Sequence, residues 1–176
     1  KLSEKLVRLI KIFDDNTAST ANQANQALAL IEELQNLLRE QADLQISALQ
    51  LCQEVVSFGN YRPMPESYFR SGKERQVIVY LELEYFRSSW LEDKKEYETL
   101  ISLTVELLDN QGRLCGRQYR VDRIRDLSPR RRRDFFIAPI VTLPSVAPGE
   151  YVLKVTASDL IANKTTQRTL SVTYQP

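Results

Sequence analysis

The chain of 176 residues contains no histidine. Histidine is the commonest general base and a frequent metal ligand, so neither a Ser/His nor a Cys/His nucleophile can be built from this chain alone. Catalysis would depend on carboxylates, such as the pairs Glu82/Glu84 and Asp122/Asp126. Carboxylates two apart on a strand more often form a polar sheet face than a hydrolase site. The sequence therefore predicts a protein that is not an enzyme.

Glycine and cysteine are also scarce. The five glycines are scattered, so the sequence has no glycine-rich phosphate cradle, and it has no calcium loop of alternating Asp and Asn. Cys52 and Cys115 match no Cys-x-x-Cys zinc or redox pattern. They either pair with each other or are two separate buried thiols. We expect no metal and no cofactor.

Neither sign of charge dominates the chain as a whole, with 24 basic and 23 acidic side chains. A global basic surface for nucleic acid is therefore absent. No stretch approaches the ~18 consecutive apolar residues that a membrane span needs. Because the chain begins with Lys1 and not with Met, we expect it to be a piece of a longer protein, and its compartment stays open.

Residues 1–54 follow the period of helices. Leu2, Leu6, Leu9 and Phe13 recur at steps that place them on one helix face, and Asp14 to Asn16 end that pattern. A second helix is expected from about Thr17–Thr20 to about Glu54. Its apolar stripe comprises Leu30, Leu34, Leu37, Leu44, Ala48, Leu51 and Val55, with Gln41 as the one polar member. We expect an antiparallel helical hairpin or coiled coil that packs on itself, on a second copy or on a partner.

Residues 55–176 follow the period of strands, and prolines appear at Pro63 and Pro65. Alternating segments, separated by turn signals such as Asp109 to Gly112, occupy residues 55–61, 76–86, 101–107, 113–121, 134–143, 151–155 and 170–174. About seven strands without intervening helices are typical of an immunoglobulin-like antiparallel β-sandwich. The predicted class is α+β, with a helical segment over 1–54 and the sandwich over 55–176.

Several runs in the second segment carry a resemblance. Pro148 to Asp159 resembles the penultimate strand of many bacterial immunoglobulin-like modules. Leu51 to Tyr61, Val79 to Phe86 and Arg131 to Phe136 are similar to a group of uncharacterised bacterial proteins, mostly from planctomycetes. The resemblance covers roughly residues 51–176. It implies an immunoglobulin-like fold and an envelope or secreted setting, and it implies no activity.

An arginine-rich stretch is the most conspicuous candidate site. Nine arginines fall within residues 113–134, among them Arg120, Arg123, Arg130, Arg131, Arg132 and Arg133. Arginine forms bidentate pairs with carboxylates and phosphates, so this stretch either binds an acidic polymer or makes ion pairs with the chain's own carboxylates. Ion pairing within the chain is the plainer reading.

Two apolar features add further candidates. Trp90 lies in a charged segment at an expected hairpin tip, where it either contacts a partner or folds back onto the sheet edge. Ile78, Tyr80 and Phe86 interrupt the polar side of their strand, so something is expected to cover them, most simply the helical segment. The sequence thus favours an interaction or assembly module, with an envelope carbohydrate- or anion-binding module as the alternative and a carboxylate-only hydrolase as the last.

Overall fold

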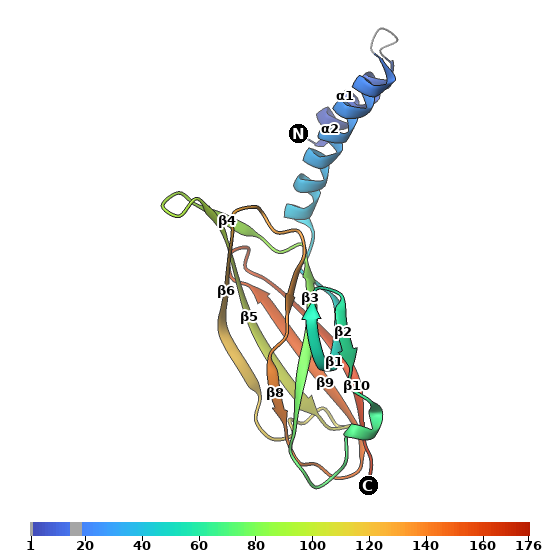
Figure 1. Ribbon diagram of the computed structural model, residues 1–176, viewed down its shortest axis with the longest axis vertical. Coiled ribbons are helices and arrows are strands. Elements are labelled where there is room, and N and C mark those ends of the chain that lie inside the picture. Colours follow the sequence, from blue (N-terminus) through green and yellow to red (C-terminus); the bar gives the residue numbers. More distant parts are fainter. Residues whose placement is uncertain (1, 15–18) are drawn as a thin grey trace. The chain divides into compact units, whose positions relative to one another are not determined.

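The structure is a computed structural model that describes residues 2–14 and 19–176. Two helices precede a series of antiparallel strands, which confirms the α+β class (Figure 1). The chain divides into two compact units, Lys1–Ala42 and Asp43–Pro176. The predicted boundary between residues 54 and 55 falls inside a strand, so the division lies 12 residues earlier in the chain than the sequence indicates.

The first unit contains α1 (Leu2–Asp14) and α2 (Thr20–Gln41). Ser19 caps α2 by accepting a hydrogen bond from the backbone N–H of Asn22 at 3.3 Å, which agrees with a helix start near Thr20. The predicted break at Asp15 and Asn16 lies outside the described residues. Lys5 forms an ion pair with Glu33, while Ile12 borders the same small cavity as Gln26. The earlier residue of α1 thus lies near the later residue of α2, and the later residue of α1 near the earlier one of α2, so the two helices are antiparallel.

The end of α2 corrects the prediction of a helix to Glu54. At Ala42 the backbone becomes extended, and residues from Gln45 onward form β1 (Gln45–Ser57). At a register shift between Ile46 and Ala48, the next buried side chain after Ile46 is three positions on, at Leu49, whereas Leu51 follows Leu49 after the two positions of a regular strand. This β-bulge makes the strand imitate a helical period in the sequence. Pairing of β1 with the apolar strand β3 decides the conformation.

The second unit contains two antiparallel five-stranded sheets, and the predicted number of about seven strands is too low for the described residues. The first sheet has the order β2-β1-β3-β7, with β8 also paired to β3; the second has the order β10-β9-β5-β4, with β6 also paired to β5. The remaining bounds are β2 (Asn60–Pro63), η1 (Glu66–Tyr68), β3 (Arg75–Glu84), β4 (Ser88–Leu91), β5 (Glu96–Leu108), β6 (Tyr119–Ser128), β7 (Phe135–Ile137), β8 (Ile140–Leu143), β9 (Gly149–Asp159) and β10 (Lys164–Tyr174).

Both sheets contribute to one hydrophobic core. Val79 and Leu81 from the first sheet and Leu103 and Val155 from the second are at most 1% exposed. Alternation places every second side chain of β3, β5 and β9 in this core, as the period of two predicts. Two segments depart from the predicted strands: the chain from Arg113 is irregular until β6 begins at Tyr119, and residues 134–143 form two short strands separated at Ala138 and Pro139.

Candidate interaction surfaces

The helical unit exposes a large share of its apolar side chains. None of the residues of α1 is buried, and α2 buries only Ala27, Leu30 and Leu34. Of the predicted α1 stripe, Leu2 and Leu9 are half-buried, whereas Leu6 and Phe13 are 47% and 60% exposed. The helix pair therefore satisfies only part of its apolar surface.

Six of the exposed apolar side chains share one side of the helix pair. Each of the six directly follows a residue of the stripe through which the helices contact each other: Leu6, Ile10 and Phe13 follow Lys5, Leu9 and Ile12, and Leu28, Ile31 and Leu38 follow Ala27, Leu30 and Leu37. Each residue of a helix is rotated by about 100° from the residue before it. In an antiparallel pair, the second helix runs in the opposite direction and also turns its contact stripe toward the first helix. The two reversals cancel, so residues one position after the contact stripe point to the same side of the pair in both helices. We call these six residues the apolar face of the helix pair.

The arginine-rich stretch makes ion pairs with the chain's own carboxylates. Arg125 of β6 pairs with Glu98 of β5 at 2.6 Å, and Arg120 pairs with Asp122. Arg132 donates to both carboxylate oxygens of Asp126, at 2.8 and 3.3 Å, and this pairing raises the pKa of Arg132. The geometry agrees with the reading of structural ion pairs for these three arginines.

The other predicted arginines lie at the surface. Arg123 is an exposed residue of β6, and Arg130, Arg131 and Arg133 are exposed in the segment between β6 and β7. The backbone N–H of Arg130 donates to Ser128 at 3.4 Å. The structure thus brings Arg132 back onto β6, and it does not gather the arginines around a described cavity.

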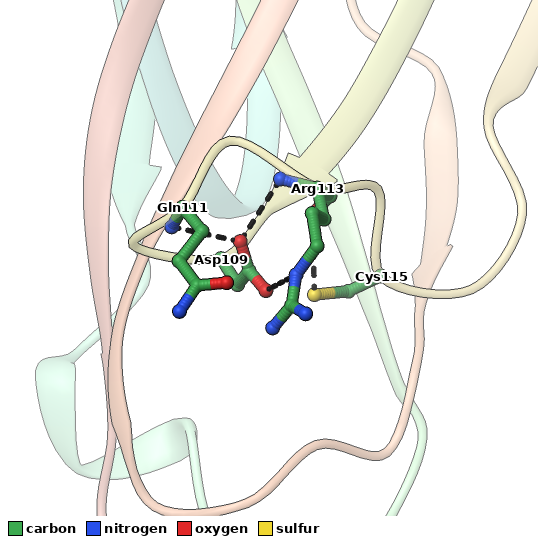
Figure 2. Close-up of polar contacts among 4 residues, drawn as sticks. All are labelled: Asp109, Gln111, Arg113 and Cys115. Carbon is green, nitrogen blue, oxygen red and sulfur yellow. Dashed lines mark hydrogen bonds and ion pairs between the residues drawn. The ribbon is translucent and has the colours of Figure 1, made fainter.

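Arg113 belongs to a tight local network at the end of β5 (Figure 2). The Asp109 carboxylate accepts from the backbone N–H groups of Gln111 and Arg113, each at 2.9 Å, and from Arg113 Nε at 2.8 Å. These hydrogen bonds, the Arg113 backbone foremost, hold the pKa of Asp109 below its ordinary value. The network forms the turn that the sequence predicts at Asp109 to Gly112, and it engages both oxygens of this carboxylate.

Both cysteines are free thiols. Cys52 is fully buried, and burial raises its pKa to about 11. Cys115 is partly buried; its Sγ donates to the Arg113 carbonyl at 3.8 Å (Figure 2). Of the two alternatives for the cysteines, the structure shows the unpaired one.

Trp90 combines the two predicted possibilities. It lies on β4, where its ring packs against Tyr97 with a centroid distance of 4.9 Å, and it remains 40% exposed. The indole is thus supported by the neighbouring strand and still presents apolar surface to solvent.

The polarity break on β3 has an explanation within its own sheet. Tyr80 is fully buried, with the ring of Tyr61 at 4.5 Å and that of Phe136 at 5.7 Å between centroids. Its hydroxyl donates to Glu82 and accepts from the Gly59 N–H at 2.8 Å. The segment expected to provide a helical cover, Leu51 to Val55, is part of β1 instead. Side chains of β2 and β7 thus flank Tyr80.

A groove between the two sheets is a feature that the sequence analysis missed. It has a volume of about 300 Å³ and lies between β1 and β10. Leu51, Met64, Phe69 and Val172 provide apolar lining, and Glu66 lies at its border. Its lining comes from β1, from the segment around η1 and from β10, which lie far apart in the sequence, so no local sequence pattern signals this tertiary arrangement.

Comparison with protein-family models and with curated proteins found no match to this chain. In the described part of the chain, neither helix combines the length and the apolar character that crossing a bilayer requires.

Proposed function

We propose that this protein is a non-enzymatic assembly module. The helix pair joins two copies of the chain, and the second unit, Asp43–Pro176, which we call the strand-rich unit, binds a protein partner. The observation that carries the proposal is the apolar face of the helix pair. A helix of 13 residues is at the lower limit of stability in water, and α1 buries none of its side chains. A second surface that covers the apolar face would stabilise both helices.

The exposed area is large enough for such an association. Its six side chains range from 38% to 64% exposed. Fully burying a side chain of this kind contributes ~1.5–3 kcal/mol, so covering the remaining half of six on each of two copies contributes roughly 9–18 kcal/mol. Association of two proteins costs on the order of 4–15 kcal/mol. The burial is therefore of the size that offsets this cost.

The charges favour a second copy as the occupant. α1 has three basic and two acidic residues, and α2 has three acidic residues and one basic residue, so the two helices differ in the sign of their net charge. A two-fold arrangement that lays α1 of one copy across α2 of the other would place these net charges of opposite sign together in a four-helix bundle, in addition to the Lys5–Glu33 pair within each copy. Self-association would thus satisfy the apolar face and the charge pattern with the same geometry.

The strand-rich unit supplies the second half of the proposal. Two antiparallel sheets that share one core support an immunoglobulin-like sandwich, an architecture used widely to present surfaces to partners. The anion-binding alternative has less support, because Arg120, Arg125 and Arg132 already pair with carboxylates of the same chain.

The test of assembly is the mass of the full chain in solution, measured by size-exclusion chromatography with light scattering. The wild type is expected as a dimer, and the double variant Ile10→Glu/Ile31→Glu as a monomer with unchanged strand signal in circular dichroism. Val7→Glu is the matched control, because Val7 is also an exposed apolar residue of α1 (52%) but lies off the apolar face. A monomeric wild type, or a double variant that keeps the dimer mass, would refute the assembly role.

A further inference from the structure

We infer that the groove between β1 and β10 binds an extended peptide segment, which adds to the exposed edge of β10 as a further strand. The inference rests on the partner-binding half of the proposed function and names the class of partner. It does not depend on the helix pair.

The edge of β10 has unused backbone hydrogen-bonding groups. Along residues 164–174, β9 is the only strand paired with β10 within the described residues, so β10 is an edge strand. Beyond its end, the Gln175 N–H donates to the Phe69 carbonyl and the Gln175 carbonyl accepts from the Ser71 N–H, both at 2.8 Å. The backbone groups of Gln175 therefore point away from β9.

The direction at Gln175 fixes the directions along the strand. Backbone groups alternate between the two edges of a strand, and the pairing of β10 with β9 shows no register shift. Ser171 and Thr173 consequently direct their N–H and C=O groups away from β9, toward the groove that they line. These two residues provide a ladder of donors and acceptors for an incoming backbone.

The chain itself already uses this edge at one point. Residues 69–71 pair with Gln175 in parallel orientation. Immediately upstream, η1 is helical, and among the described residues it forms no backbone hydrogen bond with Thr173 or Ser171. An added peptide would continue the line of pairing that Phe69 to Ser71 begins.

The two ends of the groove are defined. The Phe69–Ser71 pairing with Gln175 closes one end. Near the other end, Arg168 of β10 donates to the carbonyl oxygens of Ile46, at 2.9 Å, and Ser47 of β1. This guanidinium therefore ties β10 to β1 beside the groove.

The lining determines the side chains that the peptide needs. Leu51, Phe69 and Val172 are at most 6% exposed and form an apolar floor together with Met64. The volume of about 300 Å³ lies at the lower end of the range for ligand pockets, ~300–1,000 Å³. Glu66, an exposed carboxylate, is the one ionisable side chain among the groove's lining residues. Backbone pairing with β10 requires an extended peptide. The floor favours apolar side chains on the face of the peptide that it contacts, and Glu66 favours a basic side chain nearby. The groove therefore fits an extended peptide that is both basic and apolar.

The experiment measures binding of the acetylated and amidated peptide Thr-Val-Lys-Val-Thr-Val to the full chain by NMR titration. Two N-methylated versions block the N–H groups of either the odd or the even peptide residues. Because only one edge of the peptide pairs with β10, one version is expected to lose binding at least about tenfold and the other to keep it. Equal binding of all three peptides, or no saturable binding of the unmodified one, overturns the inference.

Two variants of β10 test the same edge from the protein side. Thr173→Pro removes an N–H that points into the groove and is expected to weaken binding about tenfold, while the ladder with β9 stays intact. Gln167→Pro is the matched control, since it removes an N–H from the same edge beyond Arg168 and should leave binding unchanged. Glu66→Lys, at an exposed position, is expected to weaken binding about threefold. Equal binding by the wild type and the Thr173 and Glu66 variants contradicts the inference.

The same titration on the monomeric helix variant Ile10→Glu/Ile31→Glu separates the two proposals. Peptide binding that survives in the monomer supports the groove regardless of assembly. A wild type that dimerises and does not bind the peptide refutes the groove and leaves the helix-pair role standing.

Discussion

Asp159 offers the sharpest test of how the strand-rich unit is held together. It is the last residue of β9 and only 1% exposed. One carboxylate oxygen accepts from the backbone N–H of Arg87 at 2.6 Å; the other accepts from those of Ile161 and Ala162 at 2.8 and 3.0 Å. The side chain thus joins the segment before β4 to the turn between β9 and β10.

The size of its contribution follows from these contacts. A hydrogen bond to a charged group contributes ~1.5–3 kcal/mol, and a buried donor left unpaired costs ~1–3 kcal/mol. Asp159→Ala removes the acceptors of three N–H groups and is expected to lower the free energy of unfolding by roughly 3–5 kcal/mol. Asp159→Asn keeps one oxygen but places an amide NH₂ against a donor, so a loss of about 2 kcal/mol is expected.

Urea unfolding monitored by tryptophan fluorescence measures both changes. Trp90, the single tryptophan, lies in the strand-rich unit and therefore reports on that unit. Ser158→Ala is a suitable control, because the neighbouring Ser158 hydroxyl shares one exposed hydrogen bond with Thr165 and should cost less than about 1 kcal/mol. If Asp159→Ala and Ser158→Ala unfold at the same urea concentration, the carboxylate does not anchor the two segments.

Two further properties follow from titrating groups. The folded-state pKa of Asp109 is depressed, so its contribution to stability is present above the ordinary value of 3.8 and is lost as pH falls through the lowered value. Asp109→Asn should therefore flatten the decline of the melting temperature in acid, and an unchanged pH profile would contradict this. Cys52 is buried with a raised pKa, so iodoacetamide should modify it more slowly than Cys115 in the native protein; mass spectrometry of the labelled peptides decides, and faster labelling of Cys52 would contradict the prediction.

The central strands were predictable from the sequence because their alternation reflects local geometry. Val77, Val79, Leu81 and Leu83 all lie in the core, as their spacing indicates. The end of α2 was not predictable in the same way. Nothing between Gln41 and Val55 is a glycine or proline, and the bulge in β1 spaces its apolar side chains as a helix would.

The candidate surfaces likewise combine features that local sequence patterns predict with features that depend on tertiary packing. The amphipathic pattern of α1 and α2 predicted helices with apolar faces, but only the antiparallel packing shows that the apolar residues that follow the contact stripe lie exposed on one side of the pair. The arginine-rich stretch was visible in the sequence, whereas its pairing depends on carboxylates such as Glu98, 27 positions from Arg125. The groove beside β10 depends on where the segment around η1 lies relative to β10, a strand about 100 residues later in the chain, so no local sequence pattern predicts the groove.

The two short strands β7 and β8 have a consequence for behaviour at high concentration. They form one margin of the first sheet, and they are three and four residues long. Pro139 stands between them, accepts from the Val79 N–H at 2.9 Å and has no N–H of its own to offer. Short edge strands and proline at a sheet edge commonly limit edge-to-edge pairing of strands between molecules. This edge of the first sheet therefore disfavours the addition of a strand from another molecule. If heating causes the protein to aggregate through its strands, we expect the aggregation to begin at a different part of the molecule.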